Sequence, residues 1–379
     1  MSKRSVYKEL LEQRGVKAKW AAPLVLLVLV ALLCCGCIGT IQRADSLQKR
    51  SGASVAAPEA PALEVEEPTQ PEPAVADDVV MTLNGDADTY VLAGEEYLEA
   101  GCHAVQTDVG DITKSVQVEG DVDPATPGDY QVTYTATTDE GAQAQATRRV
   151  HVVESLDTAQ TLPVLMYHWV YTEDAVPEDL DGNYILDTQL AQELQYLNEN
   201  GYYYPSYEEV RAFVDGTHSL PEKSVVVTFD DGEQGFLDYG IPLLEEYEVP
   251  ATSFVICSDD DASYKVNAYA SPYVRFQSHS FDMHKAGSNV GKGGVLHALS
   301  QEEILEDAQQ AEAVLGDVEA MAYPFGDNNE TAWAALEDAG VLCAFTVKNA
   351  QITPGDNPYA LNRVRVSGDY SLDSFKALL

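Results

Sequence analysis

Apolar and polar positions in the second half of the chain follow two different periods. From about residue 161, short runs rich in Val, Ile, Leu and Phe are separated by longer segments whose apolar residues share one helical face. The short runs predict buried strands, and the longer segments predict helices. We expect strands within these sequences: "LPVLMYH", "SVVVTFDD", "ATSFVIC", "YVRFQSH", "AMAYPF" and "VLCAFTV".

Capping signals place helices between these strands. The segment "LDTQLAQELQYLNENG" puts its leucines on one face and ends at a glycine. Two further segments begin with the spacing of a capping box, Ser206 with Glu209 and Ser300 with Glu303. Because strands and helices alternate, we expect an α/β fold, with a parallel sheet curled into a distorted (β/α) barrel over residues 160–379.

Residues 79–155 show the alternation of half-buried strands instead. In "PGDYQVTYTATTDEG", one face carries Tyr130, Val132, Tyr134 and Ala136, and turn residues stand on either side. The pattern predicts a small all-β sandwich. The stretch also resembles the bacterial immunoglobulin-like domains of surface proteins, and this resemblance implies a spacer.

The N-terminal residues show a third pattern. Residues 21–39, "AAPLVLLVLVALLCCGCIG", carry no charge and approach the length of a membrane helix, while residues 1–20 are basic. We therefore expect a cytoplasmic segment, an uncleaved single-pass anchor in the cell membrane and an extracellular remainder. The alternative is a lipoprotein with Cys37 as its lipidated residue. Residues 40–78 are rich in Pro, Ala and Glu and predict a linker.

The charge balance excludes one class of partner. The chain has a formal net charge of −40 and a pI near 4.2. Like charges repel, so we expect no nucleic acid among its partners and favour a neutral or cationic one.

Polar residues of interest follow the predicted strands, where barrels build their active sites. His168 follows "VLMY", Asp230 and Asp231 follow "VVVTF", and His279 follows "VRFQS". Successive side chains of an extended segment point to opposite sides, so one aspartate can bind a metal while its neighbour acts as a base. His279 and His284 are close enough in sequence to share that ion with Asp231. Two nitrogens and one oxygen leave positions open, as catalytic metal sites require.

Four motifs carry a resemblance to a known family. They are "PVLMYHWV" at 163–170, "TFDDG" at 228–232, "SHSFDMH" at 278–284 and "AYPFG" at 322–326. Together they resemble the polysaccharide deacetylases of the NodB-homology type, also called carbohydrate esterase family 4. "PVLMYH" and the wide histidine spacing are similar to the branch with the poly-β-1,6-N-acetylglucosamine deacetylases. The resemblance implies a hydrolase that removes acetyl groups from N-acetylglucosamine residues of peptidoglycan or poly-N-acetylglucosamine.

The resemblance also implies a role for each candidate residue. Asp231, His279 and His284 would hold a divalent metal, which is typically zinc in this family. Cobalt, nickel or manganese would also suit this ligand set. Asp230 would be the general base, and the backbone N–H of Tyr323 would help to bind the oxyanion.

Two departures from the family pattern change the expected assignments. The late Leu-x-His motif, which supplies the general acid, is missing, because the C-terminal stretch "YALNRVRVSGDY" contains no histidine. We expect His168 to take its place, with His297 as the other candidate. The arginine that often precedes the "YPF" element is also absent, so we expect Arg363 to orient Asp230.

The sequence thus predicts an extracellular, metal-dependent N-deacetylase of a polysaccharide that contains N-acetylglucosamine. Two alternatives stay open. One is a catalytically inactive wall-binding or adhesion protein of the same fold, against which the intact acids and histidines argue. The other is a metal-dependent hydrolase of a small amide. The predicted anchor, linker and spacer suit a polymer outside the cell better than a small substrate.

Overall fold

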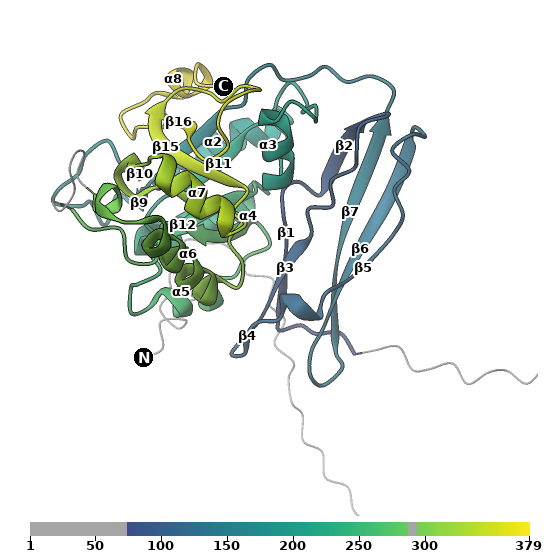
Figure 1. Cartoon of the computed structure of the whole chain (residues 1–379), viewed down its shortest axis with the longest axis horizontal. Coiled ribbons are helices and arrows are strands. Elements are labelled where there is room, and N and C mark those ends of the chain that lie inside the picture. The colour runs from purple at the N-terminus through teal and green to yellow at the C-terminus, as the bar shows by residue number, and fades with distance from the viewer. Residues whose placement is uncertain (1–73, 287–293) are drawn as a thin grey trace, which may run out of the picture. The chain divides into compact units, whose positions relative to one another are not determined.

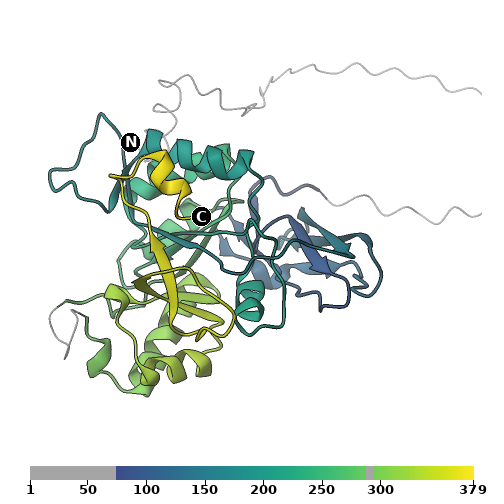
Figure 2. The same cartoon turned by 90° about the horizontal axis from the view of Figure 1, so that it is seen from above.

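The computed structural model describes residues 74–286 and 294–379 (Figure 1 and Figure 2). The predicted cytoplasmic segment and membrane anchor, and most of the predicted linker, lie outside these residues. Within the described ranges, no helix combines the length and the apolar character needed to cross a membrane.

Seven parallel strands of the described chain close into a barrel in the order β11-β12-β13-β14-β15-β16-β8. The barrel closes at β8, which pairs with both β11 and β16. The strands are β8 (Val164–Tyr167), β11 (Val226–Phe229), β12 (Ala251–Val255), β13 (Val274–Ser278), β14 (Ala320–Ala322), β15 (Cys343–Asn349) and β16 (Leu361–Arg365). Beside β8, the short strands β9 (Trp169–Tyr171) and β10 (Tyr184–Leu186) pair in parallel.

The predicted barrel is confirmed, but the sequence pattern missed one of its strands. The sequence of β16, "LNRVR", contains two arginines and no continuous apolar run. Arg363 nevertheless has no exposed surface. A buried arginine is uncommon unless it is paired, so an apolar pattern could not reveal this strand.

Helices cover the outside of the barrel, and α6 and α7 pack side by side along one flank (Figure 1). The helices are α2 (Asp187–Glu199), α3 (Tyr207–Val214), α4 (Ile241–Glu246), α5 (Ala262–Ala268), α6 (Gln301–Leu315), α7 (Glu330–Asp338) and α8 (Leu372–Lys376). Short helical turns lie at Thr113–Ser115, Phe236–Gly240, Leu296–Ala298 and Pro324–Gly326. Both predicted capping boxes are present, at the starts of α3 and α6. The leucines of α2 are buried in the barrel's core.

The predicted β-sandwich precedes the barrel and is drawn in blue in Figure 1. One sheet has the order β2-β7-β6-β5 and the other β1-β3-β4. The strands are β1 (Val79–Leu83), β2 (Asp88–Leu92), β3 (Cys102–Gln106), β4 (Gly110–Asp111), β5 (Gln117–Glu119), β6 (Gly128–Thr137) and β7 (Gln143–Val153). Val132, Tyr134 and Ala136 of β6 are buried, as their alternation predicted.

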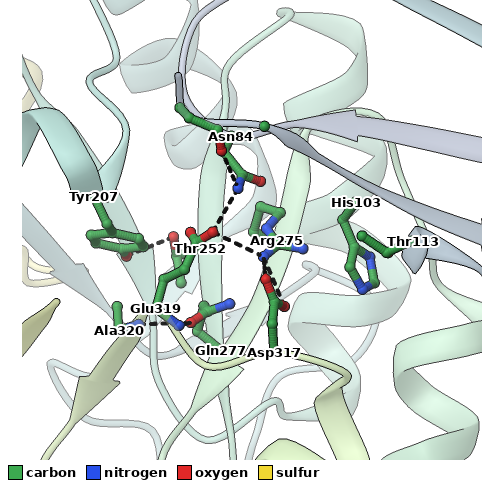
Figure 3. A network of polar contacts seen from close by, with 12 residues as sticks. Asn84, His103, Thr113, Tyr207, Thr252, Arg275, Gln277, Asp317, Glu319 and Ala320 are labelled. Atoms are coloured by element: carbon green, nitrogen blue, oxygen red, sulfur yellow. Dashed lines mark hydrogen bonds and ion pairs between the residues drawn. The ribbon is translucent and has the colours of Figure 1, made fainter. Parts of the chain in front are cut away.

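The sandwich and the barrel belong to one compact unit, Pro73–Leu379, and share a partly buried polar contact. Asn84, just after β1, donates its side-chain N–H to Glu319 Oε1 at 2.7 Å. Glu319 directly precedes β14. Figure 3 shows this contact beside the ion pair of Arg275 and Asp317, whose atoms lie 2.9 and 3.0 Å apart. The sandwich thus contacts the N-terminal ends of the barrel strands.

Candidate active site

The candidate residues meet at the C-terminal end of the barrel. His168 follows β8, Asp230 and Asp231 follow β11, His279 follows β13, and Arg363 lies in β16. Parallel strands present their C-terminal ends at one rim, so residues distant in sequence come together there. This rim is opposite to the strand ends that contact the sandwich.

Asp231, His279 and His284 form a cluster that fits a divalent metal. Their potential ligand atoms all lie within 4.8 Å of one another. Asp231 Oδ1 lies 3.4 Å from His279 Nε2 and 3.6 Å from His284 Nε2. His279 Nδ1 lies 2.7 Å from the carbonyl oxygen of Ala322 and therefore donates its hydrogen to it. This bond occupies Nδ1 and leaves Nε2, which faces Asp231, as the nitrogen that could bind a metal.

The charges within this cluster shift its protonation. Burial by itself would raise the pKa of Asp231, but the contact with His279 outweighs burial and lowers it. Burial likewise opposes the charged form of His279, yet Asp231 and Asp230 raise the pKa of His279. Burial and the neighbouring His279 lower the pKa of His284. A metal bound here would have to displace the proton that His279 favours.

A left-handed turn separates the two aspartates. Asp231 has a φ of 74° and Gly232 a φ of 62°, a region that aspartate tolerates and glycine adopts readily. A Cβ at position 232 would also lie 3.0 Å from a methyl group of Val255, so a larger residue would be strained here by both the backbone and the tight contact. Sequence reasoning attributed the divergence of Asp230 and Asp231 to alternation along an extended strand. The structure achieves it differently, because Asp231 has left the strand conformation.

Asp230 and Arg363 form a buried, two-point ion pair. Arg363 donates one hydrogen bond to each carboxylate oxygen of Asp230, both at 2.7 Å. The side chains are 2% and 0% exposed, respectively. Burial alone would raise the pKa of Asp230, but the charge and hydrogen bonds of Arg363 outweigh it and hold that pKa well below its usual range. The expected contact is confirmed, and it keeps Asp230 ionised at neutral pH.

His168 lies beside this pair. Its Nε2 is 3.9 Å from Asp230 Oδ2, and its side chain is 16% exposed. Burial lowers the pKa of His168 against the opposing charges of Asp230 and Asp231. The other candidate acid, His297, is exposed, and its Nδ1 lies 3.4 Å from the side-chain nitrogen of Asn329. His168 is therefore the histidine placed next to the candidate base.

Tyr323 does not occupy the expected role in this structure. We expected its backbone N–H to bind an oxyanion. Instead, this N–H donates to the carbonyl oxygen of Phe345 at 3.0 Å. Its ring is buried, and its hydroxyl donates to the carbonyl oxygen of Tyr359 at 3.0 Å. The backbone N–H of Tyr323 is thus part of the hydrogen-bond ladder between β14 and β15, instead of binding an oxyanion. The motif residue serves packing and sheet pairing.

Two residues shape the site through contacts that the sequence did not predict, although Trp169 had been expected to form a wall for a sugar ring. The indole N–H of Trp169 donates to Asp231 Oδ2 at 3.0 Å. Asp307 of α6 accepts the backbone N–H groups of Phe281 at 2.8 Å and Asp282 at 2.7 Å, which holds the loop between the two histidines. Asp307 could have been noticed in the sequence, because it is an aspartate on the otherwise apolar face of a capped helix. Trp169 had no such signal, because its contact depends on the turn at Asp231.

Comparison with known families agrees with this geometry. Residues 217–344 match the polysaccharide deacetylase family, and residues 81–152 match the Ig-like domain of bacterial surface proteins. The chain contains a polysaccharide deacetylase domain. The matched part of the deacetylase domain includes the metal cluster and Asp230, whereas His168 and Arg363 lie outside it.

Individual relatives of the deacetylase domain include two poly-β-1,6-N-acetyl-D-glucosamine N-deacetylases. The protein from Staphylococcus aureus strain MRSA252 is 28% identical over 166 residues, which are 40% of this chain and 57% of the relative. The protein from Staphylococcus epidermidis is 26% identical over 230 residues, 54% of this chain and 78% of the relative. This chain thus spans little more than half the length of the first relative.

A solved structure shows the same fold. The Streptococcus pyogenes deacetylase PplD, determined in complex with acetate, superposes with a TM-score of 0.50 and 21% identity. The match covers 58% of this chain and 99% of that chain. At this identity the likeness concerns the fold of the deacetylase domain.

Proposed function

We propose that this protein is an extracellular, metal-dependent hydrolase that removes acetyl groups from N-acetylglucosamine residues of a polysaccharide. The observation that carries the proposal is the cluster of Asp231, His279 and His284 beside the buried pair of Asp230 and Arg363. A metal site with open positions next to an ionised carboxylate suits the hydrolysis of an amide. The names of the staphylococcal relatives favour poly-β-1,6-N-acetylglucosamine over peptidoglycan as the polymer.

Asp231, His279 and His284 would hold the metal, with zinc as the ion that best suits two imidazoles and one carboxylate. When bound there, a divalent ion supplies Lewis-acid polarisation of the acetamide carbonyl and acidifies water. The remaining chemistry belongs to the side chains of the protein.

Asp230 is the proposed general base. Arg363 keeps it ionised and fixes its orientation, so that it can accept the proton of the attacking water. Each oxygen of Asp230 already accepts one bond from Arg363 and has a second lone pair for that proton. The strongly lowered pKa makes Asp230 a weak base, so the proton it accepts passes on readily.

His168 is the proposed general acid for the leaving amine. At rest its imidazole is neutral, because burial lowers its pKa. It therefore has to gain a proton during the reaction, and Asp230 at 3.9 Å is close enough to supply one after a small movement. The sequence of transfers would run from water to Asp230, then to His168, then to the amine.

Sequence features support the proposed location. An apolar run at 21–39 follows a basic segment, and a linker rich in Pro, Ala and Glu separates it from the folded unit. An enzyme anchored in this way would act on a polymer outside the cell. Its net charge of −40 would attract the cationic amines that deacetylation produces.

The test measures acetate release by the purified full chain in mild detergent from poly-N-acetylglucosamine oligomers, peptidoglycan fragments and a small N-acetylated amide. Chelator should abolish the release, and added zinc should restore it. Asp230→Asn and His168→Ala should each lose at least about a hundredfold in kcat. His297→Ala, at an exposed histidine outside the cluster, should retain wild-type activity.

The substrates separate the remaining alternatives. Acetate release from one of the two polymers would identify that polymer as the substrate. Acetate release from the small amide alone would mean that the enzyme acts on a small amide and not on a polysaccharide. Metal binding without acetate release from any of the three would favour the inactive binding protein.

A further inference from the structure

The indole of Trp169 divides the two carboxylate oxygens of Asp231 between different partners. Its Nε1 donates to Oδ2 at 3.0 Å. The other oxygen, Oδ1, is the one that faces His279 Nε2 at 3.4 Å and His284 Nε2 at 3.6 Å. A carboxylate without this bond could rotate and turn either oxygen, or both, toward a metal. The indole bond opposes that rotation and holds the carboxylate with Oδ1 turned toward the two histidines.

The indole is itself held in position by neighbouring rings and by the backbone. β9 and β10 pair in parallel with Trp169 opposite Tyr184, and the Trp169 backbone N–H donates to the carbonyl oxygen of Asn183 at 3.1 Å. The ring centroids of Trp169 and Tyr184 lie 4.5 Å apart, with planes tilted by 57°. Tyr171 packs edge-on against Tyr184 at 6.4 Å. The N–H is therefore aimed at Asp231 before any ligand binds.

We propose that Trp169 is a positioning residue for the metal ligand Asp231. It would present Oδ1 to a metal held with the two histidines, while Oδ2 stays bonded to the indole. This inference rests on the metal site of the proposed function. An indole has a single donor and no acceptor, so Trp169 cannot itself replace a ligand. Removal of such an outer-shell partner typically weakens metal binding by about 10–100-fold.

The test compares Trp169→Phe, which keeps an aromatic ring and removes the N–H, with Trp333→Phe. Trp333 also donates its indole N–H to a side-chain oxygen, that of Asn328 at 3.1 Å, which does not belong to the metal cluster. Zinc is titrated calorimetrically into each metal-free full chain in detergent. We expect Trp169→Phe to raise the Kd for zinc by about 10–100-fold. Trp333→Phe should leave the Kd unchanged.

Steady-state kinetics at saturating zinc provide a second readout. A residue that orients a ligand should change kcat, whereas KM for the acetylated oligomer should stay within about twofold of wild type. An increase in KM alone, with an unchanged Kd for zinc, would mean that Trp169 contacts the sugar and would overturn the positioning role.

A measurement without substitution covers the case in which Trp169→Phe fails to fold. In the wild-type chain labelled with ¹⁵N-tryptophan, the indole resonance of Trp169 should shift as zinc is added and saturate at one equivalent. The resonance of Trp333 should stay in place. A wild-type chain that binds no zinc would overturn both the proposed function and this inference. Zinc binding with a stationary Trp169 resonance, or with an unchanged Kd in a folded Trp169→Phe variant, would overturn this inference alone.

Discussion

Removal of Arg363 should destabilise the protein strongly, because the buried carboxyl group of Asp230 would lose the partner that compensates its charge. The side chains are 0% and 2% exposed and share two hydrogen bonds of 2.7 Å. Breaking a buried pair from one side costs about 3–5 kcal/mol of unfolding free energy. Arg363→Met also loses the bonds from Arg363 to the carbonyl oxygen of Thr346 and the hydroxyl of Thr228. We therefore expect a loss near the upper end of that range.

A double-mutant cycle separates the ion pair from these other bonds. Asp230→Asn, Arg363→Met and the double variant are unfolded in urea with chelator present, and circular dichroism follows the transition. Urea is uncharged and leaves the ion pair unscreened, and the chelator removes stabilisation by bound metal. The double variant should be more stable than the sum of the single effects predicts by roughly 2–3 kcal/mol.

The outcome that would refute this reasoning is specific. If Arg363→Met alone stays within about 1 kcal/mol of wild type, the buried charge of Asp230 does not depend on Arg363. If the single effects are large but simply add, the cost arises from the separate bonds of Arg363 and not from the pair.

Three further predictions concern residues that support the candidate site and the barrel. Burial raises the pKa of Glu193 from 4.5 to about 7, so the folded state holds a proton that the unfolded state has lost. The unfolding free energy of wild type, relative to that of Glu193→Gln, should therefore be greatest at low pH. It should fall by roughly 3 kcal/mol as the pH rises from 4.5 to above 7. Urea unfolding across that pH range measures this difference. Asp307 accepts hydrogen bonds from two backbone N–H groups, and Asp307→Asn would place an NH2 donor opposite one of them. This substitution should lower the unfolding free energy by roughly 1–3 kcal/mol in the same assay without metal. Asn84→Ala leaves Glu319 without its donor between the sandwich and the barrel, and it should lower the thermal midpoint by several degrees, equivalent to about 1–3 kcal/mol.

Matched controls test whether these effects come from burial. Glu199→Gln changes an exposed acid of α2, Glu306→Gln changes the exposed neighbour of Asp307, and Gln145→Ala changes an exposed side chain of the sandwich. Each should stay within about 0.5 kcal/mol of wild type. An effect as large as that of the buried partner would contradict the corresponding prediction. A pH profile of Glu193→Gln that parallels wild type would show that Glu193 does not titrate as its burial implies.

The docking of the sandwich also affects how the enzyme is prepared. Asn84 contacts the barrel through Glu319, at the strand ends opposite to the candidate site. The immunoglobulin-like domain therefore helps to support the barrel. Tests of activity should use chains that retain it.

The sequence alone predicted those features that depend on residues close together in the chain. The capping boxes at Ser206 and Ser300, the alternation in β6 and most barrel strands follow from local periodicity, and the structure has them. The cluster of Asp231, His279 and His284 was also predicted, because strand ends of a parallel barrel meet at one rim whatever the exact register. The predicted membrane anchor lies outside the described residues and stays a prediction.

Only the tertiary structure decided which groups the residues of the site contact. Arg363 reaches Asp230 across 133 positions because β16 pairs with β8 when the barrel closes, and its buried charge hid the strand from an apolar pattern. The pairing of β14 with β15 uses the N–H of Tyr323, and the turn at Asp231 brings one of its oxygens to Trp169. Such contacts depend on barrel closure, strand register and side-chain direction. These are properties of the whole packed chain, and local periodicity carries no information about them.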